Sequence, residues 1–135
     1  MNTTETADSF SGLMQVITKR RTIRSFISKP IEEEALRKCL EAGHWAPSAC
    51  NRQLWEFVVV DDPKIIRKLE SITQQPTPHA IYIAIFYDLT KELPGSRLGD
   101  VQSAAIAAQN LMLVAHSLGY GTKMMVGLNS PESIG

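Results

Sequence analysis

The 135-residue sequence predicts a single domain in which helices alternate with β-strands, and three observations support this class. The length and the 44% content of hydrophobic residues suffice for one compact core. Apolar residues recur at helical spacing in some segments and form short β-rich runs in others. No internal repeat or low-complexity segment interrupts the alternation. We therefore expect one domain over residues 1–135.

Composition argues against several function classes. Fourteen basic and fourteen acidic residues cancel, so no long-range field draws the chain to nucleic acid or to an anionic membrane. No apolar stretch approaches the roughly 20 residues of a membrane span, and the N-terminus lacks a secretory pattern. Two cysteines without framework spacing and three histidines without metal-ligand spacing predict reduced thiols and no metal site. A cytoplasmic protein is expected.

Two amphipathic helices are expected in the first third of the chain. Residues 9–20 form the first, with Ser9 or Ser11 as its cap. Residues 30–46 form the second, opened by Pro30 and an acidic first turn. One face of the first helix carries Phe10, Leu13, Met14 and Ile17, and in the second helix the residues that can face a core are Ile31, Leu36, Leu40 and Trp45.

The middle of the chain reads as strand, helix, strand. Residues 57–61 (FVVVD) are a short β run, and residues 62–72 are a helix opened by Asp62 and Pro63. Residues 80–88 are apolar at nearly every position, which predicts a strand in the middle of a sheet. Residues 88–99 then form a loop.

A long helix is expected over residues 100–118, because five alanines and apolar residues occupy most of its faces. Such a helix is buried, either within the domain or at a subunit interface. Gly119 is a left-handed cap, and residues 120–127 follow as a third strand or a strand-like loop. Residues 129–135 (NSPESIG) have the pattern of a helix start, but the sequence ends before a stable helix can form. We therefore expect either that the sequence is a truncated form of a longer domain or that a partner replaces the missing part.

The basic segment KRRTIR, residues 19–24, has two interpretations. Cations at the end of a helix are favoured by the helix dipole, so the segment can be a solvated helix terminus. Alternatively it is a phosphate clamp, because arginine offers a planar fork of donors and Thr22 adds a hydroxyl.

The segment APSACNRQLWEF, residues 46–57, also has two interpretations. Ser48 and Asn51 can bond their own backbone in an ordinary turn. In the functional alternative, Ser48, Asn51 and Gln53 contact a flat polar ring, since an amide side chain serves either donors or acceptors. Two further motifs fail: residues 119–124 follow a helix and lack the third glycine of a dinucleotide fingerprint, and no GxSxG elbow supports a hydrolase.

The order of three segments resembles the nitroreductase family of flavin enzymes. RRTIR (residues 20–24) matches a basic R-R-S/T-x-R landmark, and PSACNRQLW (residues 47–55) matches P-S-x-x-N-x-Q-P-W, with Leu54 in place of proline. Residues 100–121 match a long helix with Ala-Ala and Gln-Asn pairs that ends in L-G-x-G. The three landmarks together span most of the chain.

The resemblance implies an α+β fold with a central mixed or antiparallel sheet wrapped by helices, in an intertwined homodimer with FMN at the interface. It places the FMN phosphate and ribityl chain on the basic segment and the ring near the second landmark of the other subunit. The implied cofactor-binding residues are Arg20, Arg21, Thr22, Arg24, Pro47, Ser48, Ala49, Asn51 and Gln53.

The implied activity is ping-pong transfer of electrons from NADH or NADPH, through FMN, to an electron-poor acceptor such as a nitroaromatic or quinone. No catalytic side chain is nominated, because the cofactor carries the chemistry. The resemblance also implies a chain that lacks the family's C-terminal third. A second class stays open: a flavin-binding or protein-interaction module of the same fold that does not turn over. A nucleic-acid-binding domain is disfavoured by the zero net charge and the absence of spaced aromatic residues.

Overall fold

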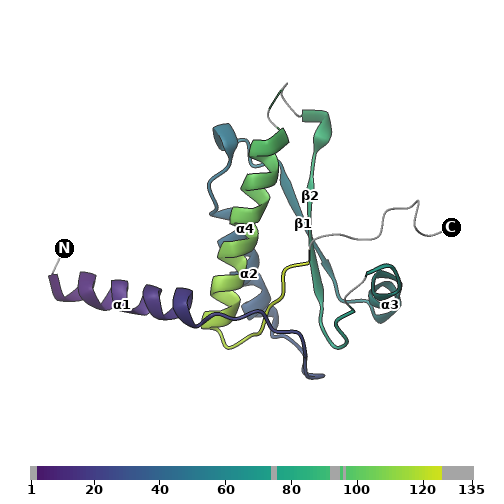
Figure 1. The fold of residues 1–135 in the computed structure, drawn as a ribbon, viewed down its shortest axis with the longest axis horizontal. Helices are drawn as coiled ribbons and strands as arrows, with labels where there is room; N and C mark the ends of the chain where they lie inside the picture. The colour runs from purple at the N-terminus through teal and green to yellow at the C-terminus, as the bar shows by residue number, and fades with distance from the viewer. Residues whose placement is uncertain (1–2, 74–75, 92–94, 96, 126–135) are drawn as a thin grey trace.

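A computed structural model of the chain describes residues 3–73, 76–91, 95 and 97–125 (Figure 1). Its elements in chain order are α1 (Thr3–Lys19), α2 (Glu33–His44), η1 (Ala49–Asn51), β1 (Trp55–Val60), α3 (Pro63–Ile72), β2 (Tyr82–Tyr87), η2 (Leu89–Lys91) and α4 (Arg97–Ser117). Helices and an antiparallel pair of strands give the α+β class. None of the helices within these ranges is long and apolar enough to cross a membrane.

The two strands form an antiparallel pair connected through α3. The register runs from Trp55 opposite Tyr87 to Val60 opposite Tyr82. β1 begins two residues before the predicted strand, because Trp55 already pairs with β2 and is buried. The prediction that β2 lies mid-sheet is wrong for the described residues, since β1 is its one strand partner there. Ile83 and Ile85 of β2 pack against core clusters that include residues of α4, whereas Phe86 is 56% exposed.

Helices α2 and α4 pack against each other and against one side of the strand pair, with α3 on the other side (Figure 1). One core cluster joins Ala107 of α4, which is fully buried, to Ala46 and Trp55. A second cluster joins Cys39 to Leu111 and Ala115. Alanines at these positions let α4 approach its neighbours closely. Other side chains of α4 remain open, since Leu98, Val101 and Ile106 are 69%, 58% and 41% exposed.

Several predicted boundaries and orientations in α2 are wrong. The helix begins at Glu33 instead of Pro30, so Ile31 precedes it and is 36% exposed. The helix ends at His44, and Trp45 has a cap conformation outside the helical repeat. The side chain of Trp45 is therefore 80% exposed instead of facing the core.

Helix α1 leaves the body of the domain (Figure 1). It begins at Thr3, so neither Ser9 nor Ser11 caps it. The predicted apolar face is formed by Phe10, Leu13, Met14 and Ile17, but these side chains are between 38% and 67% exposed. Within the part of the chain that the structure describes, no core therefore covers this face.

The end of the described chain contacts the segment that follows α1. Thr22 and Thr122 form an isolated parallel bridge, so residues 120–125 are a strand-like loop rather than a third strand. The predicted loop over residues 88–99 contains η2, and α4 starts within it at Arg97. The helix start predicted at residues 129–135 lies outside the described residues.

Candidate functional site

The turn after α4 brings the chain back beside the basic segment. Gly119 adopts a left-handed φ of +85°, as predicted for the cap. The Tyr120 N–H donates to the Ala115 carbonyl at 2.9 Å, and the Gly119 N–H donates to the His116 carbonyl at 3.0 Å. These are the two hydrogen bonds of a Schellman motif. The chain then meets the basic segment, where the Ile23 N–H donates to the Thr122 carbonyl at 2.9 Å.

A cavity of about 460 Å³ lies between these two segments. It is lined by Lys19, Arg20, Arg21, Ile23, His116, Gly119, Tyr120, Gly121 and Thr122. The hydroxyl oxygen of Thr122 is buried and has no hydrogen-bond partner among the described residues. Three cations and an unused hydroxyl group make this cavity suited to an anion, although the whole chain is neutral.

The arginines of the basic segment do not behave alike. The guanidinium of Arg21 donates to the carbonyls of Thr18 at 2.6 Å and of Arg20 at 2.9 Å, which is the helix-terminus role. Within the described residues, the side chains of Arg20 and Arg24 form no hydrogen bond or ion pair. Arg20 lines the cavity, whereas Arg24 and Thr22 are exposed outside its lining.

The second predicted cluster forms a compact turn between α2 and β1. The Gln53 N–H donates to Ser48 Oγ at 3.0 Å, and the Asn51 N–H donates to the Ser48 carbonyl at 2.9 Å. Ser48 therefore has the turn-forming role, and Pro47 is exposed beside it. Gln53 Nε2 donates to Asn51 Oδ1 at 2.9 Å, so the two amides form a pair on the surface.

Three residues of this turn have left-handed backbone conformations without being glycine. The φ angles are +54° at Cys50, +54° at Asn51 and +49° at Gln53. Such conformations cost on the order of 1–3 kcal/mol each and persist where the surroundings fix them. The turn is therefore held in place by contacts outside itself.

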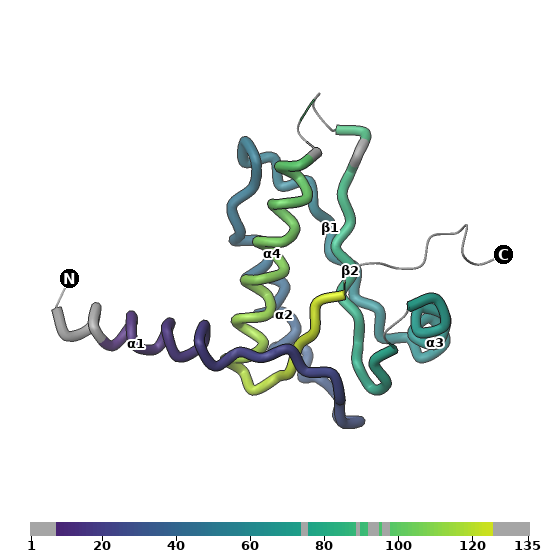
Figure 2. Tube along the Cα trace, in the orientation of Figure 1, coloured from purple at the N-terminus to yellow at the C-terminus, as the bar shows by residue number. Residues whose placement is uncertain are grey.

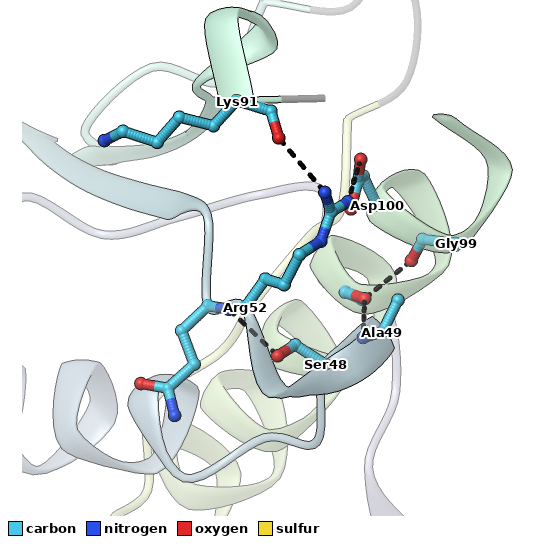
Figure 3. A network of polar contacts seen from close by, with 8 residues as sticks. Ser48, Ala49, Arg52, Lys91, Gly99 and Asp100 are labelled. Atoms are coloured by element: carbon cyan, nitrogen blue, oxygen red, sulfur yellow. Dashed lines mark hydrogen bonds and ion pairs between the residues drawn. The ribbon is translucent and has the colours of Figure 1, made fainter. Parts of the chain in front are cut away.

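Those contacts come from the N-terminal turns of α4 and from η2 (Figure 3). Arg52 Nη2 donates to both carboxylate oxygens of Asp100, at 2.7 and 2.9 Å, and Nη1 donates to the Lys91 carbonyl at 3.0 Å. Ser103 Oγ accepts from the Ala49 N–H at 3.1 Å and donates to the Gly99 carbonyl at 2.6 Å.

Sequence reasoning missed Arg52, Asp100 and Ser103. Two signals were available for them: Arg52 lies inside the second landmark, and Asp100 and Ser103 are three residues apart on one helix face.

The two predicted clusters lie at opposite ends of α4 in one chain (Figure 2). Ser103 contacts the 48–53 turn and His116 lines the basic cavity. At about 1.5 Å per helical residue, these two positions are about 20 Å apart along the axis. One chain therefore does not bring the two sets of predicted cofactor contacts together.

The described residues provide neither a metal site nor a reactive buried thiol in these clusters. Within the described ranges, no group of three or more His, Cys, Asp or Glu side chains is placed to hold a metal ion. Both cysteines are free, with Cys50 exposed and Cys39 buried. Burial raises the pKa of the Cys39 thiol, which makes it a poor nucleophile.

Comparison with known proteins assigns the family. The model of the nitroreductase family matches residues 17–82 and 73–134, which is most of the chain. The chain belongs to the nitroreductase family. The two matched ranges include both clusters described above, so the landmarks that carry the sequence resemblance lie in the matched region.

Relatives and solved structures agree with this assignment. The chain is 33% identical over 114 residues to an NADH dehydrogenase/NAD(P)H nitroreductase of Methanothermobacter thermautotrophicus, covering 81% of this chain and 58% of the relative. Among solved structures, a nitroreductase from Desulfovibrio desulfuricans in complex with FMN is 35% identical, with a TM-score of 0.70, covering 78% of this chain and 63% of that one. An FMN-dependent nitroreductase from Clostridium difficile is 32% identical, with a TM-score of 0.68, covering 80% and 62%. This nitroreductase-family chain thus spans about three fifths of these proteins.

Proposed function

We propose that the chain is an FMN-dependent oxidoreductase that passes electrons from NADH or NADPH to an electron-poor acceptor such as a nitroaromatic or quinone, in ping-pong order. The relative from Methanothermobacter thermautotrophicus is named for NADH and NAD(P)H, and two similar structures are described with FMN. The observation that carries the proposal is the basic cavity next to the first family landmark, with Arg20 free to bind an anion.

The residues present fit the two ends of FMN. For the phosphate, the cavity offers Lys19, Arg20 and the buried Thr122 hydroxyl that lacks a partner among the described residues. For the ring, Asn51 Nδ2 and Gln53 Oε1 are a donor and an acceptor on exposed side chains, and they form no hydrogen bond within the described ranges. Arg21, Thr22 and Arg24, with Pro47, Ser48 and Ala49, complete the proposed contact set.

A homodimer is part of the proposal because the two clusters are separated by α4. A second copy that runs antiparallel along α4 would place its 48–53 turn beside the first copy's basic cavity. The exposed apolar face of α1 supports this arrangement, since no other described residues of the chain cover Phe10, Leu13, Met14 and Ile17. Each of the two composite sites would then contain residues from both copies.

The proposed role of this chain's own residues is to bind FMN and to orient its ring. Bound FMN supplies hydride and electron transfer between a nicotinamide and an acceptor. Arg20 and Lys19 would hold the anionic end, and Asn51 and Gln53 would orient the ring edge. No side chain of this protein is proposed as a nucleophile or as a general acid or base.

The test is the visible absorption spectrum of the purified 135-residue protein after incubation with FMN and removal of free flavin. Retained FMN at one per chain, followed by NAD(P)H oxidation with a nitroaromatic or quinone, is expected. Retained FMN without turnover would indicate a flavin-binding module, and a folded protein without flavin would contradict the proposal.

The combined variant Arg20→Ala and Arg24→Ala tests the phosphate contacts. Loss of the two cations should abolish FMN retention and leave the helical circular dichroism unchanged, because neither side chain has a partner within the described residues. Arg67→Ala is the control, since it removes an exposed arginine from α3. Unchanged FMN affinity in the double variant would contradict the assignment of the basic segment.

A further inference from the structure

An ion pair connects the 48–53 turn to α4 in a nearly dry environment. The side chains of Arg52 and Asp100 are 16% and 8% exposed, and one guanidinium nitrogen contacts both carboxylate oxygens. The other ion pairs of the described residues, such as Arg37 with Glu34, involve at least one side chain that is about half exposed or more. Arg52 with Asp100 is therefore shielded from water in a way that surface pairs are not.

Two sets of contacts attach the turn to its surroundings close to its strained residues. Ala49 is fixed by Ser103 on one side, and Arg52, fixed by Asp100 and the Lys91 carbonyl, separates Asn51 from Gln53. Cys50 and Asn51, which have left-handed φ angles, lie between these two points, and Gln53, which also has one, directly follows Arg52. Because a non-glycine residue leaves that conformation when its surroundings allow, the attachment points maintain the local geometry.

We propose that the Arg52–Asp100 pair is a positioning device that sets the orientation of the Asn51 and Gln53 amides toward the flavin ring. This inference rests on the proposed function, because the amides matter only if they contact the cofactor. Neither Arg52 nor Asp100 touches the ring in this role. Both act through the backbone of the turn, which they hold against α4 (Figure 3).

The test separates positioning from stability with a double substitution. Arg52→Met or Asp100→Leu alone leaves one charge buried without its main partner, so each single variant should unfold at a lower temperature. Combining them removes both charges and should restore the melting temperature toward the wild type. The FMN dissociation constant of the double variant should nevertheless stay raised by about tenfold or more, the equivalent of one misplaced hydrogen bond.

A second readout does not involve FMN. The N–H groups of Ala49, Asn51, Arg52 and Gln53 are all hydrogen-bonded. In the flavin-free double variant, hydrogen exchange at these amides should be about tenfold faster or more than in the wild type, because the turn opens locally. The control is Glu34→Gln with Arg37→Gln, which removes an exposed arginine–carboxylate pair from α2 and should change neither readout.

The outcomes distinguish this inference from the proposed function. A stable double variant with wild-type FMN affinity, or with wild-type amide exchange, would overturn the positioning role. If the wild-type chain itself retains no FMN, the proposed function fails and the flavin part of the inference fails with it. The exchange comparison then still decides whether the pair holds the turn.

Discussion

Gly121 allows the chain after α4 to approach the basic segment. A Cβ atom at this position would lie 2.8 Å from Cγ1 and 3.0 Å from Cβ of Ile23, the residue whose N–H bonds Thr122. Gly121→Ala should therefore lower the free energy of unfolding by about 1–3 kcal/mol, the typical cost of overpacking. Chemical denaturation followed by circular dichroism measures the change.

Gly12→Ala is the matched control for this prediction. A Cβ atom at Gly12, within α1, would meet no atom within 4 Å. Alanine is favoured over glycine in a helix by about 1 kcal/mol, so this variant should be neutral or slightly more stable. Equal effects of the two substitutions would show that the contact with Ile23 is not tight.

Glu34 contributes stability that depends on pH. The hydrogen bond from Arg37, together with the charges of Arg37 and Lys38, lowers the pKa of Glu34 from 4.5 to about 2. Since the folded pKa is depressed, the stabilisation is complete above pH 4.5 and is lost as the pH falls through about 2. Both side chains are exposed, so the effect is small.

Thermal unfolding between pH 6 and pH 2 tests the contribution of Glu34. Glu34→Gln should make the decline of the melting temperature shallower over this range, because the ion pair is already absent. Glu33→Gln is the control: it changes the neighbouring carboxylate, which forms no ion pair within the described residues. Parallel curves for Glu34→Gln and the wild type would contradict the prediction.

At the scale of the element, α3 is the helix whose start was predicted most closely. Asp62 precedes Pro63, and Asp62 Oδ1 accepts from the Lys64 N–H at 2.7 Å. Asp62→Ala should lower the free energy of unfolding by about 1 kcal/mol, because the cap satisfies an otherwise unpaired donor. Urea denaturation measures it, with Asp61→Ala as the control; an equal loss in both variants would exclude the cap as the cause.

Element prediction succeeded where the deciding contacts are local. Helix α3 starts at Pro63 after the Asp62 cap, and the turn at Gly119 follows the end of α4. Both boundaries are fixed by hydrogen bonds between residues only a few positions apart. It failed where the contacts are distant. Trp45 was expected to face the core but lies past the last turn of α2. The apolar pattern of β2 predicted a strand with two neighbours, whereas Ile83 and Ile85 pack against the core clusters and β1 is its strand partner in the described part of the chain.

At the scale of the whole molecule, the proposed dimer predicts that a charge on the apolar face of α1 changes the oligomeric state. Leu13→Glu places a charge on the exposed apolar face, so it should shift the protein from dimer to monomer in sedimentation velocity. Gln15→Glu adds the same charge to the opposite side of α1 and should leave the dimer intact. A monomeric wild type, or a dimeric Leu13→Glu variant, would contradict the proposed use of this face.

The sequence by itself determined the family, the alternation of helices and strands, and the two segments to which the proposed cofactor contacts belong. These follow from residue spacing, capping chemistry and three ordered landmarks. The landmarks also predict a phosphate role for Arg20, which lines the same cavity as Thr122.

Only the tertiary structure decided that the two clusters lie at opposite ends of α4 and that Arg52 and Asp100 hold the second one. The physical reason is distance along the chain: this ion pair joins residues 48 positions apart. Spacing rules describe residues within a few turns of one another, whereas such a contact depends on how α2, α4 and the strands pack. The burial that shields the pair from water is likewise a property of the packed domain.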